Sequence, residues 1–201
     1  MEAQLLIIFV KAPLIGEVKT RLAKAIGPEA ARAAYCRLAD TLFHNLSNLN
    51  GVQLRVSPDH ALDDVRHWQR DSWMVSPQGT GDLGQRLEAA FAAAFAQGAR
   101  RVVVIGSDCP SIQPEDIERS WAELEECDVV LGPASDGGYW LIGLKEPRPA
   151  LFRKIPWSTE SVLRETVSRA TSEALKVALL QKRSDVDTES DWNRFLSGDL
   201  M

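Results

Sequence analysis

The sequence is poor in cysteine: 201 residues contain only Cys36, Cys109 and Cys127, which are widely spaced. An odd number at such spacing is typical neither of a disulfide framework nor of a zinc site, so we expect a reducing compartment. The three histidines show no partner pattern and receive no role. Catalysis or binding is therefore expected to depend mainly on other side chains.

Long apolar runs are also absent. The run at residues 5–10 is too short to span a membrane, and no basic region precedes it as a signal peptide would require. These features predict a cytoplasmic protein without a membrane partner. The net charge of −5 and the pI of about 5.3 disfavour a nucleic-acid partner, whereas basic loops on an acidic body suit a small anionic ligand.

Strand and helix patterns alternate along most of the chain, with no internal repeat and no long linker. This order predicts a single α/β domain over residues 1–201, with a mostly parallel sheet of about seven strands between two helical layers. The expected strands are 5–10, 52–56, 73–75, 101–106, 128–131, one within 132–144, and 175–180. The expected helices are 17–24, 28–46, 61–69, 83–97, 113–126, 158–170 and a closing helix within 185–198.

The first expected strand leads into the loop KAPLIGEVKTRL. Pro13 and Gly16 break the strand pattern, and a helix start follows them. A strand, a glycine-containing loop and a helix N-terminus form a ready phosphate site, to which Lys11, Lys19 and Arg21 add positive charge. Within this first loop the orders G-x-x-x-x-G-K-[ST] and G-x-G-x-x-G are absent, so the loop is neither a P-loop nor a dinucleotide fingerprint. An ordinary strand-loop-helix with solvated basic residues remains the alternative.

Three aspartates follow expected strands, at the sheet edge where ligands bind in such folds. Asp108 ends the most apolar strand and could hold Mg²⁺ or Mn²⁺ between phosphates, or serve as a helix cap. Asp187 could be a second ligand, although Asp187, Thr188 and Asp191 also resemble a helix N-cap. Asp136, in SDGGY, could contact the metal, a sugar hydroxyl or an acceptor, or be only a turn residue.

A second glycine-rich loop, QGTGDLGQRL, runs into an alanine-rich helix. Backbone amides near Gly79 and Gly81 suit recognition of a base or ribose. Arg86 could reach a phosphate or lie in solvent. Cys109, beside Asp108, is a weak candidate nucleophile because no histidine lies near it in sequence.

Four motifs, KAPLIGEVKTRL, QGTGDLGQRL, GSDCP and ASDGGYWLIGL, together resemble the GT-A-like transferases known as radical-SAM/selenodomain-associated transferases. The resemblance covers nearly the whole chain and extends more distantly to nucleotidyltransferases. It implies the nucleotide-diphospho-sugar transferase fold. It also implies a nucleotide site, a divalent metal held by Asp108 and Asp187, and catalytic roles for Asp108, Lys19 and Asp136. The nucleotide-binding residues that it implies are Lys11, Ala12, Pro13, Gly16, Lys19, Thr20, Arg21, Gln78, Gly79, Gly81, Asp82 and Arg86.

Two departures from the pattern bear on the reaction. The first loop lacks the L-A-A-G-x-G-x-R-M/L pattern of the better-known nucleotidyltransferases, and the D-x-D pair of glycosyltransferases is reduced to S-D-C around Asp108. The resemblance and the altered first loop favour a transferase that uses Mg²⁺ or Mn²⁺ to move a glycosyl group from a nucleotide-sugar to a small acceptor, whereas the three basic residues of that loop favour a triphosphate donor. Nucleotidyl transfer from a triphosphate, with release of pyrophosphate, is the first alternative. A non-catalytic nucleotide-binding protein is the second, and a homodimer is a default expectation.

Overall fold

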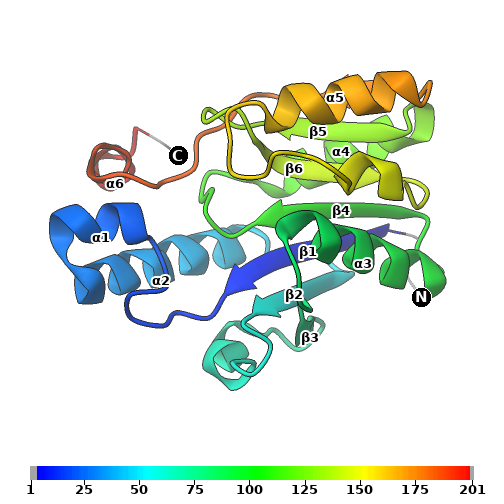
Figure 1. Cartoon of the computed structure of the whole chain (residues 1–201). Helices are drawn as coiled ribbons and strands as arrows, with labels where there is room; N and C mark the ends of the chain where they lie inside the picture. Colours follow the sequence, from blue (N-terminus) through cyan, green and yellow to red (C-terminus); the bar gives the residue numbers. More distant parts are fainter. Residues whose placement is uncertain (1–3, 200–201) are drawn as a thin grey trace.

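A computed structural model describes residues 4–199, so the expected domain range of 1–201 extends past the described residues at both ends. Its centre is a seven-stranded sheet in the order β3-β2-β1-β4-β6-β5-β7 (Figure 1). The strands are β1 (Gln4–Lys11), β2 (Val52–Ser57), β3 (Met74–Pro77), β4 (Arg101–Gly106), β5 (Val129–Pro133), β6 (Tyr139–Leu144) and β7 (Val177–Leu179). Only β6 runs antiparallel to its neighbours within this sheet. The predicted mostly parallel α/β sheet of seven strands is confirmed.

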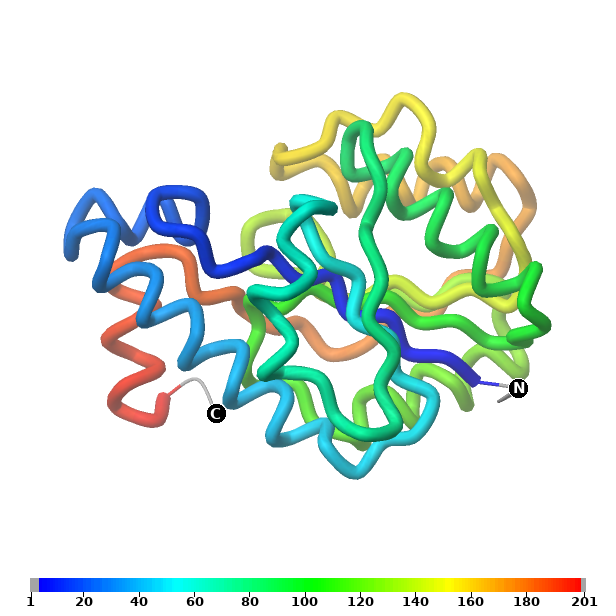
Figure 2. The backbone as a smooth tube through the Cα atoms, turned by 90° about the horizontal axis from the view of Figure 1, so that it is seen from below, coloured from blue at the N-terminus to red at the C-terminus, as the bar shows by residue number. Residues whose placement is uncertain are grey.

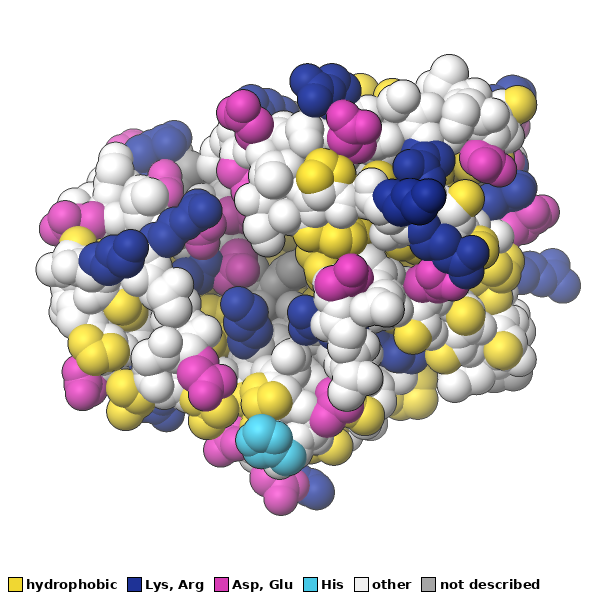
Figure 3. Space-filling view, viewed as in Figure 1, with side chains coloured by type: hydrophobic (Ala, Val, Ile, Leu, Met, Phe, Trp, Pro, Cys, Tyr) yellow, Lys and Arg dark blue, Asp and Glu magenta, His cyan; other side chains and the backbone are white. Residues whose placement is uncertain are grey.

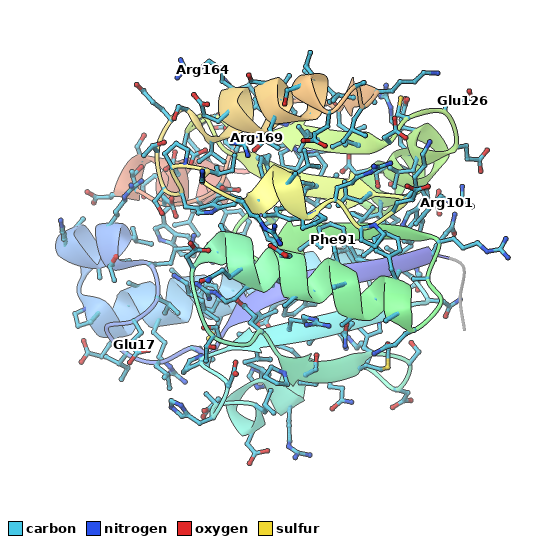
Figure 4. The ribbon with its side chains drawn as sticks, turned by 45° about the vertical axis from the view of Figure 1, so that its right-hand side comes forward. Glu17, Phe91, Arg101, Glu126, Arg164 and Arg169 are labelled. Atoms are coloured by element: carbon cyan, nitrogen blue, oxygen red, sulfur yellow. The ribbon has the colours of Figure 1, made fainter. Side chains whose placement is uncertain are left out.

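Helices cover both faces of the sheet. On one face lie α2 (Pro28–Asn45) and α4 (Pro114–Glu126), and on the other lie α3 (Leu83–Ala96) and α5 (Val162–Ser172). Phe91 shows how the second face packs: it points from α3 towards the sheet (Figure 4) and stacks on Phe152 with ring centroids 5.5 Å apart. The apolar strands are buried between these layers, as near-continuous hydrophobic runs require.

Two further helices, α1 (Thr20–Ile26) and α6 (Glu189–Ser197), stand beyond the carboxyl ends of the central strands (Figure 1). The tube view shows the C-terminal segment running beside α2 (Figure 2). Trp192 of α6 packs on the apolar cluster around Leu22 and on the cluster around Leu38. The C-terminal helix α6 thereby packs against α1 and α2, close to the loop that joins β1 to α1.

Several expected element boundaries were wrong. The helix expected at 17–24 begins only at Thr20, because Lys19 adopts a left-handed conformation with φ 48°. The helix expected at 158–170 begins at Val162, because Ser158 has φ 64° and a turn precedes the helix. The segments η1 (Asp63–Trp68) and η2 (Pro149–Phe152) are 3₁₀ helices. Across residues 4–199, no helix combines the length and apolar character needed to cross a membrane.

Candidate functional site

A cavity of about 530 Å³ opens at the carboxyl edge of the sheet, between the β1–α1 loop and the turn that joins β5 to β6. Figure 3 shows a hollow on this side of the molecule with basic and acidic side chains gathered around it. The predicted site residues that line the cavity are Lys11, Lys19, Thr20, Arg21, Asp108, Asp136 and Asp187. Residues from opposite ends of the chain therefore share one polar site.

Lys19 lies at the centre of the charges in this cavity. Its ammonium Nζ is 2.7 Å from Oδ1 of Asp108 and 3.0 Å from Oδ1 of Asp187, and its side chain is only 3% exposed. Burial lowers the pKa of Lys19, but the two carboxylates outweigh burial and hold the pKa above its ordinary value. Lys19 is therefore charged at neutral pH.

The two carboxylates remain half accessible from the cavity. The side chain of Asp108 is 43% exposed and that of Asp187 is 38% exposed. Neither is a helix cap: α4 is capped by Gln113, and α6 by Thr188 in a capping box with Asp191. Both carboxylates are thus free for a role in the cavity.

Asp185 belongs to the same cluster, although the sequence reasoning did not select it. Burial and, second, the neighbouring Asp108 carboxylate together raise the pKa of Asp185 to about 7, against the opposing effect of Lys19. The signal was present as the spacing Asp185-Val186-Asp187, which is the D-x-D pattern sought around Asp108. The amide of buried Val186 donates to the Asp108 carbonyl over 3.1 Å, which places this segment beside the end of β4.

Tyr35 is a second residue that sequence reasoning missed. It lies on α2, inside an apparently ordinary apolar helix pattern, and it lines the cavity. Its hydroxyl donates to the Lys11 carbonyl, accepts from the Lys11 amide, both over 3.0 Å, and lies 2.9 Å from Oγ of Ser107. Burial raises the pKa of Tyr35, so the hydroxyl stays protonated. Tyr35 thereby fixes the end of β1 against the residue that precedes Asp108.

The remaining residues of the first loop have mainly structural contacts. Ala12 and Pro13 are buried, the Ala12 amide donates to the Ser57 carbonyl, and the Pro13 carbonyl accepts from Arg32. Gly16 is exposed at the tip of the loop, with φ 83° and open space around it.

The second glycine-rich loop lies outside the lining of this cavity, and its polar groups are largely paired. Gln78 is buried, with its amide donating to the carbonyls of Val10 and Arg55 and its oxygen accepting from Arg86. The Gly79 amide donates to Asp59 over 3.0 Å. Asp82 caps α3 and Gly81 has φ 100°. The cavity is thus lined by the first loop and the aspartates, and the second glycine-rich loop takes no part in its lining.

Asp136 and Cys109 differ in what they offer to the cavity. Asp136 is exposed on the β5–β6 turn, where its carboxylate accepts from the Gly138 amide over 2.9 Å. Cys109 is buried, and burial raises the pKa of its thiol to about 12. A thiol with that pKa is a poor nucleophile at neutral pH.

The sequence profile of a family described as "uncharacterized protein conserved in bacteria (DUF2064)" matches residues 44–159, more than half of the chain. The chain belongs to this family. A crystal structure from Desulfovibrio desulfuricans G20, provisionally named a nucleotide-diphospho-sugar transferase, is 32% identical to this family member. It superposes with a TM-score of 0.92 over 99% of this chain and 88% of the other. No curated protein sequence matches the chain.

Two more distant structures are similar in fold. A CMP:2-keto-3-deoxy-manno-octonic acid synthetase complexed with CTP is 10% identical, with a TM-score of 0.59 over 98% of this chain and 99% of the other. The manganese complex of Rv0371c from Mycobacterium tuberculosis is 16% identical, with a TM-score of 0.53 over 96% and 98% of the two chains. These matches confirm the nucleotide-diphospho-sugar transferase fold.

Proposed function

We propose that this DUF2064 protein is a metal-dependent transferase that takes a glycosyl group from a nucleotide-sugar and passes it to a small acceptor. The observation that carries the proposal is the shared cavity, in which the cations Lys11, Lys19 and Arg21 lie beside Asp108 and Asp187. The Desulfovibrio desulfuricans relative, whose name gives the same class of activity, supports the transferase prediction.

The basic wall of the cavity suits the phosphates of the donor. Lys11 and Arg21 are exposed, so their charged groups can contact phosphate oxygens without leaving a buried position. As the bond to the sugar breaks, negative charge grows on the leaving nucleoside diphosphate, and fixed cations stabilise that charge. Asp136, which lines the same cavity on the β5–β6 turn, would contact an acceptor or a sugar hydroxyl.

The donor set fits a hard divalent cation. Among residues 4–199 no three His, Cys, Asp or Glu side chains form a ready metal cage. Mg²⁺ does not need one, since it commonly binds through one or two carboxylates and completes its shell with phosphate oxygens and water. Asp108 and Asp187 would hold Mg²⁺ or Mn²⁺, which would act as a Lewis acid and template for the phosphates.

Nucleotidyl transfer is the second candidate, because the same cations would serve a triphosphate. The synthetase bound to CTP has the same fold, and its name describes that class of reaction. The two reactions differ in the product released from the donor, which is a nucleoside diphosphate for glycosyl transfer and pyrophosphate for nucleotidyl transfer.

A thermal-shift panel tests the proposal with nucleoside diphosphates, nucleotide-sugars and triphosphates, each with and without Mg²⁺ or Mn²⁺. A ligand that binds only the folded state raises the unfolding midpoint. We expect a metal-dependent shift with a nucleotide-sugar or its diphosphate, lost in Asp108→Ala and kept in the exposed control Asp71→Ala. Shifts only with triphosphates would favour nucleotidyl transfer. No shift with any compound would refute the donor site and favour a non-catalytic protein.

The sequence also leads us to propose a single domain over residues 1–201, a cytoplasmic location, a homodimer and membership of the radical-SAM/selenodomain-associated transferases. Size-exclusion chromatography with light scattering would test the homodimer directly.

A further inference from the structure

The Lys19 side chain fills the place between the two carboxylates that the proposed function assigns to a metal. Its ammonium pairs with one oxygen of Asp108 and one of Asp187, at 2.7 Å and 3.0 Å. A divalent ion held by the same two oxygen atoms would lie beside this ammonium. Repulsion between two cations at such range is strong in a site where one partner is almost fully buried.

The backbone of Lys19 is also in an unusual conformation. Lys19 has φ 48° and ψ 44°, the left-handed conformation that non-glycine residues rarely adopt. Such a conformation is strained and persists only where surrounding contacts hold it. As the N-cap of α1, Lys19 makes no side-chain hydrogen bond to the helix, so its two carboxylate partners are the polar contacts that hold the side chain.

Around Lys19 the carboxylates outnumber the buried cations, so the site can accept a further cation. The carboxylates of Asp108 and Asp187 share the single buried ammonium of Lys19, and Asp136 lines the same cavity. The Arg21 guanidinium lies 3.8 Å from the Asp187 carboxylate, but the Arg21 side chain is 68% exposed. Its positive charge is therefore screened by solvent and offsets the charge of Asp187 only weakly. A ligand that brings both phosphates and a divalent ion would offer Lys19 new anionic partners and the carboxylates a new cation.

We propose that Lys19 is a displaceable internal cation, which holds the metal position in the free protein and yields it when a divalent ion and nucleotide phosphates arrive together. The Lys19 ammonium then pairs with phosphate oxygens inside the same cavity. This inference rests on the proposed function, because it takes Asp108 and Asp187 as the metal ligands. It requires metal and nucleotide to bind with positive coupling, each raising the affinity for the other.

The test measures Mn²⁺ binding by the decrease in the electron paramagnetic resonance signal of free Mn²⁺, first without nucleotide. The proteins are wild type, Lys19→Met, and Lys24→Met as a matched control on the same helix. Lys24 is exposed and forms no ion pair within residues 4–199. We expect Lys19→Met to bind Mn²⁺ at least about tenfold more tightly than wild type, because the competing charge is removed. Lys24→Met should match wild type.

The second arm adds CDP, GDP, UDP or ADP. Wild type should then bind Mn²⁺ at least about tenfold more tightly with the cognate nucleotide, and Lys19→Met should lose most of that gain. Lys19→Gln, which keeps a hydrogen-bond donor, gives the same comparison if Lys19→Met fails to fold by circular dichroism.

Three outcomes would overturn the inference, and they separate it from the proposed function. Tight Mn²⁺ binding by wild type without nucleotide, or equal affinities in wild type and both Lys19 variants, would show that Lys19 does not compete with metal. In either case nucleotide-dependent binding would still support the transferase. If wild type binds neither Mn²⁺ nor any nucleotide, the proposed function fails, and the displacement of Lys19 fails with it.

Discussion

The backbone of Gly137 lies so close to the backbone of Glu160 that no side chain fits between them. Gly137 has φ 89°, and its carbonyl accepts from the Leu163 amide over 2.9 Å. The turn that carries Asp136 is therefore fixed against the loop that carries Glu160, and both line the cavity. Two walls of the site thus depend on one glycine.

Substitution of this glycine should be more costly than its backbone conformation alone implies. Gly27 has nearly the same φ, 88°, with ψ 157°, and open space around its Cβ position, so Gly27→Ala should lose only the backbone strain of about 1–3 kcal/mol. Gly137→Ala adds a collision with backbone atoms and should lose about 2 kcal/mol more. Urea unfolding of both variants measures the difference. Equal losses would show that the Glu160 loop yields freely.

Much of the fold was predictable because its signals are local. The run RVVVIG has almost no polar residue, as a strand buried on both faces requires, and it forms β4. Alternation of such runs with amphipathic helices determines a mostly parallel sheet, and parallel strands bring their carboxyl ends to one edge. The loops that follow the strands were therefore expected at one edge, and Lys11 at the end of β1 and Asp108 after β4 share the cavity there.

The rest of the site depends on contacts that sequence spacing cannot show. Lys19 and Asp187 are separated by 168 positions, and their pairing follows from the packing of α6 against α1. The left-handed conformations of Lys19 and Ser158, which shorten two helices, are unusual for these residue types and carry no local signal. Asp185 was missed because its D-x-D spacing with Asp187 gains meaning only when tertiary packing brings this segment beside Asp108.

Arg183 and Asp116 form a largely buried ion pair, in which the two side chains are 18% and 17% exposed. Two Arg183 contacts to the Asp116 carboxylate measure 2.7 Å and 2.8 Å, and the guanidinium also lies 5.6 Å from the Trp140 ring centroid. Arg183→Met would leave a largely buried carboxylate without its ion-pair partner, with only the hydrogen bond from the Gln113 amide remaining among the described contacts. We expect a loss of roughly 2–3 kcal/mol in the free energy of unfolding.

An exposed pair supplies the matched control for this prediction. Arg66 pairs with Asp63, but their side chains are 72% and 84% exposed. Arg66→Met should therefore lose less than about 1 kcal/mol. Chemical denaturation of the two variants in parallel measures both losses, and similar values would mean that the Arg183 pair gains nothing from its burial.

Tyr35→Phe should weaken both the fold and the proposed donor site. Removal of the hydroxyl leaves the Lys11 amide and the buried Ser107 hydroxyl without their partner, at a cost of about 1–3 kcal/mol. Lys11 would also lose its tie to α2, so we expect weaker binding of the nucleotide identified in the thermal-shift panel. Isothermal titration measures that affinity. An unchanged affinity with reduced stability would limit Tyr35 to a structural role.

Asp128 predicts a specific dependence of stability on pH. The hydrogen bond from the Lys176 amide, aided by Lys145 against the effect of burial, lowers the pKa of Asp128 below its ordinary value. A lowered folded pKa stabilises the protein above the unfolded pKa of 3.8, and this contribution is lost as pH falls through the folded pKa. The free energy of unfolding of wild type should exceed that of Asp128→Asn by roughly 0.5 kcal/mol near pH 6, and by less near pH 3.

Urea titrations of both proteins across this pH range measure the difference at each point. Asp71→Asn, at an exposed position without hydrogen bonds or ion pairs in residues 4–199, is the control for the general effect of charge. A difference between wild type and Asp128→Asn that grows as pH falls would contradict the sign of the expected effect.

Cys109 should be inert in the folded protein despite its place beside Asp108. Its thiol is buried, and its pKa of about 12 leaves almost no thiolate at pH 8. Iodoacetamide should therefore label Cys109 only in urea, whereas half-buried Cys127 should react earlier in native buffer. Peptide mass spectrometry over time distinguishes the two sites. Native labelling of Cys109 as fast as Cys127, together with loss of transfer in Cys109→Ala, would restore the nucleophile hypothesis and oppose a mechanism based on charge alone.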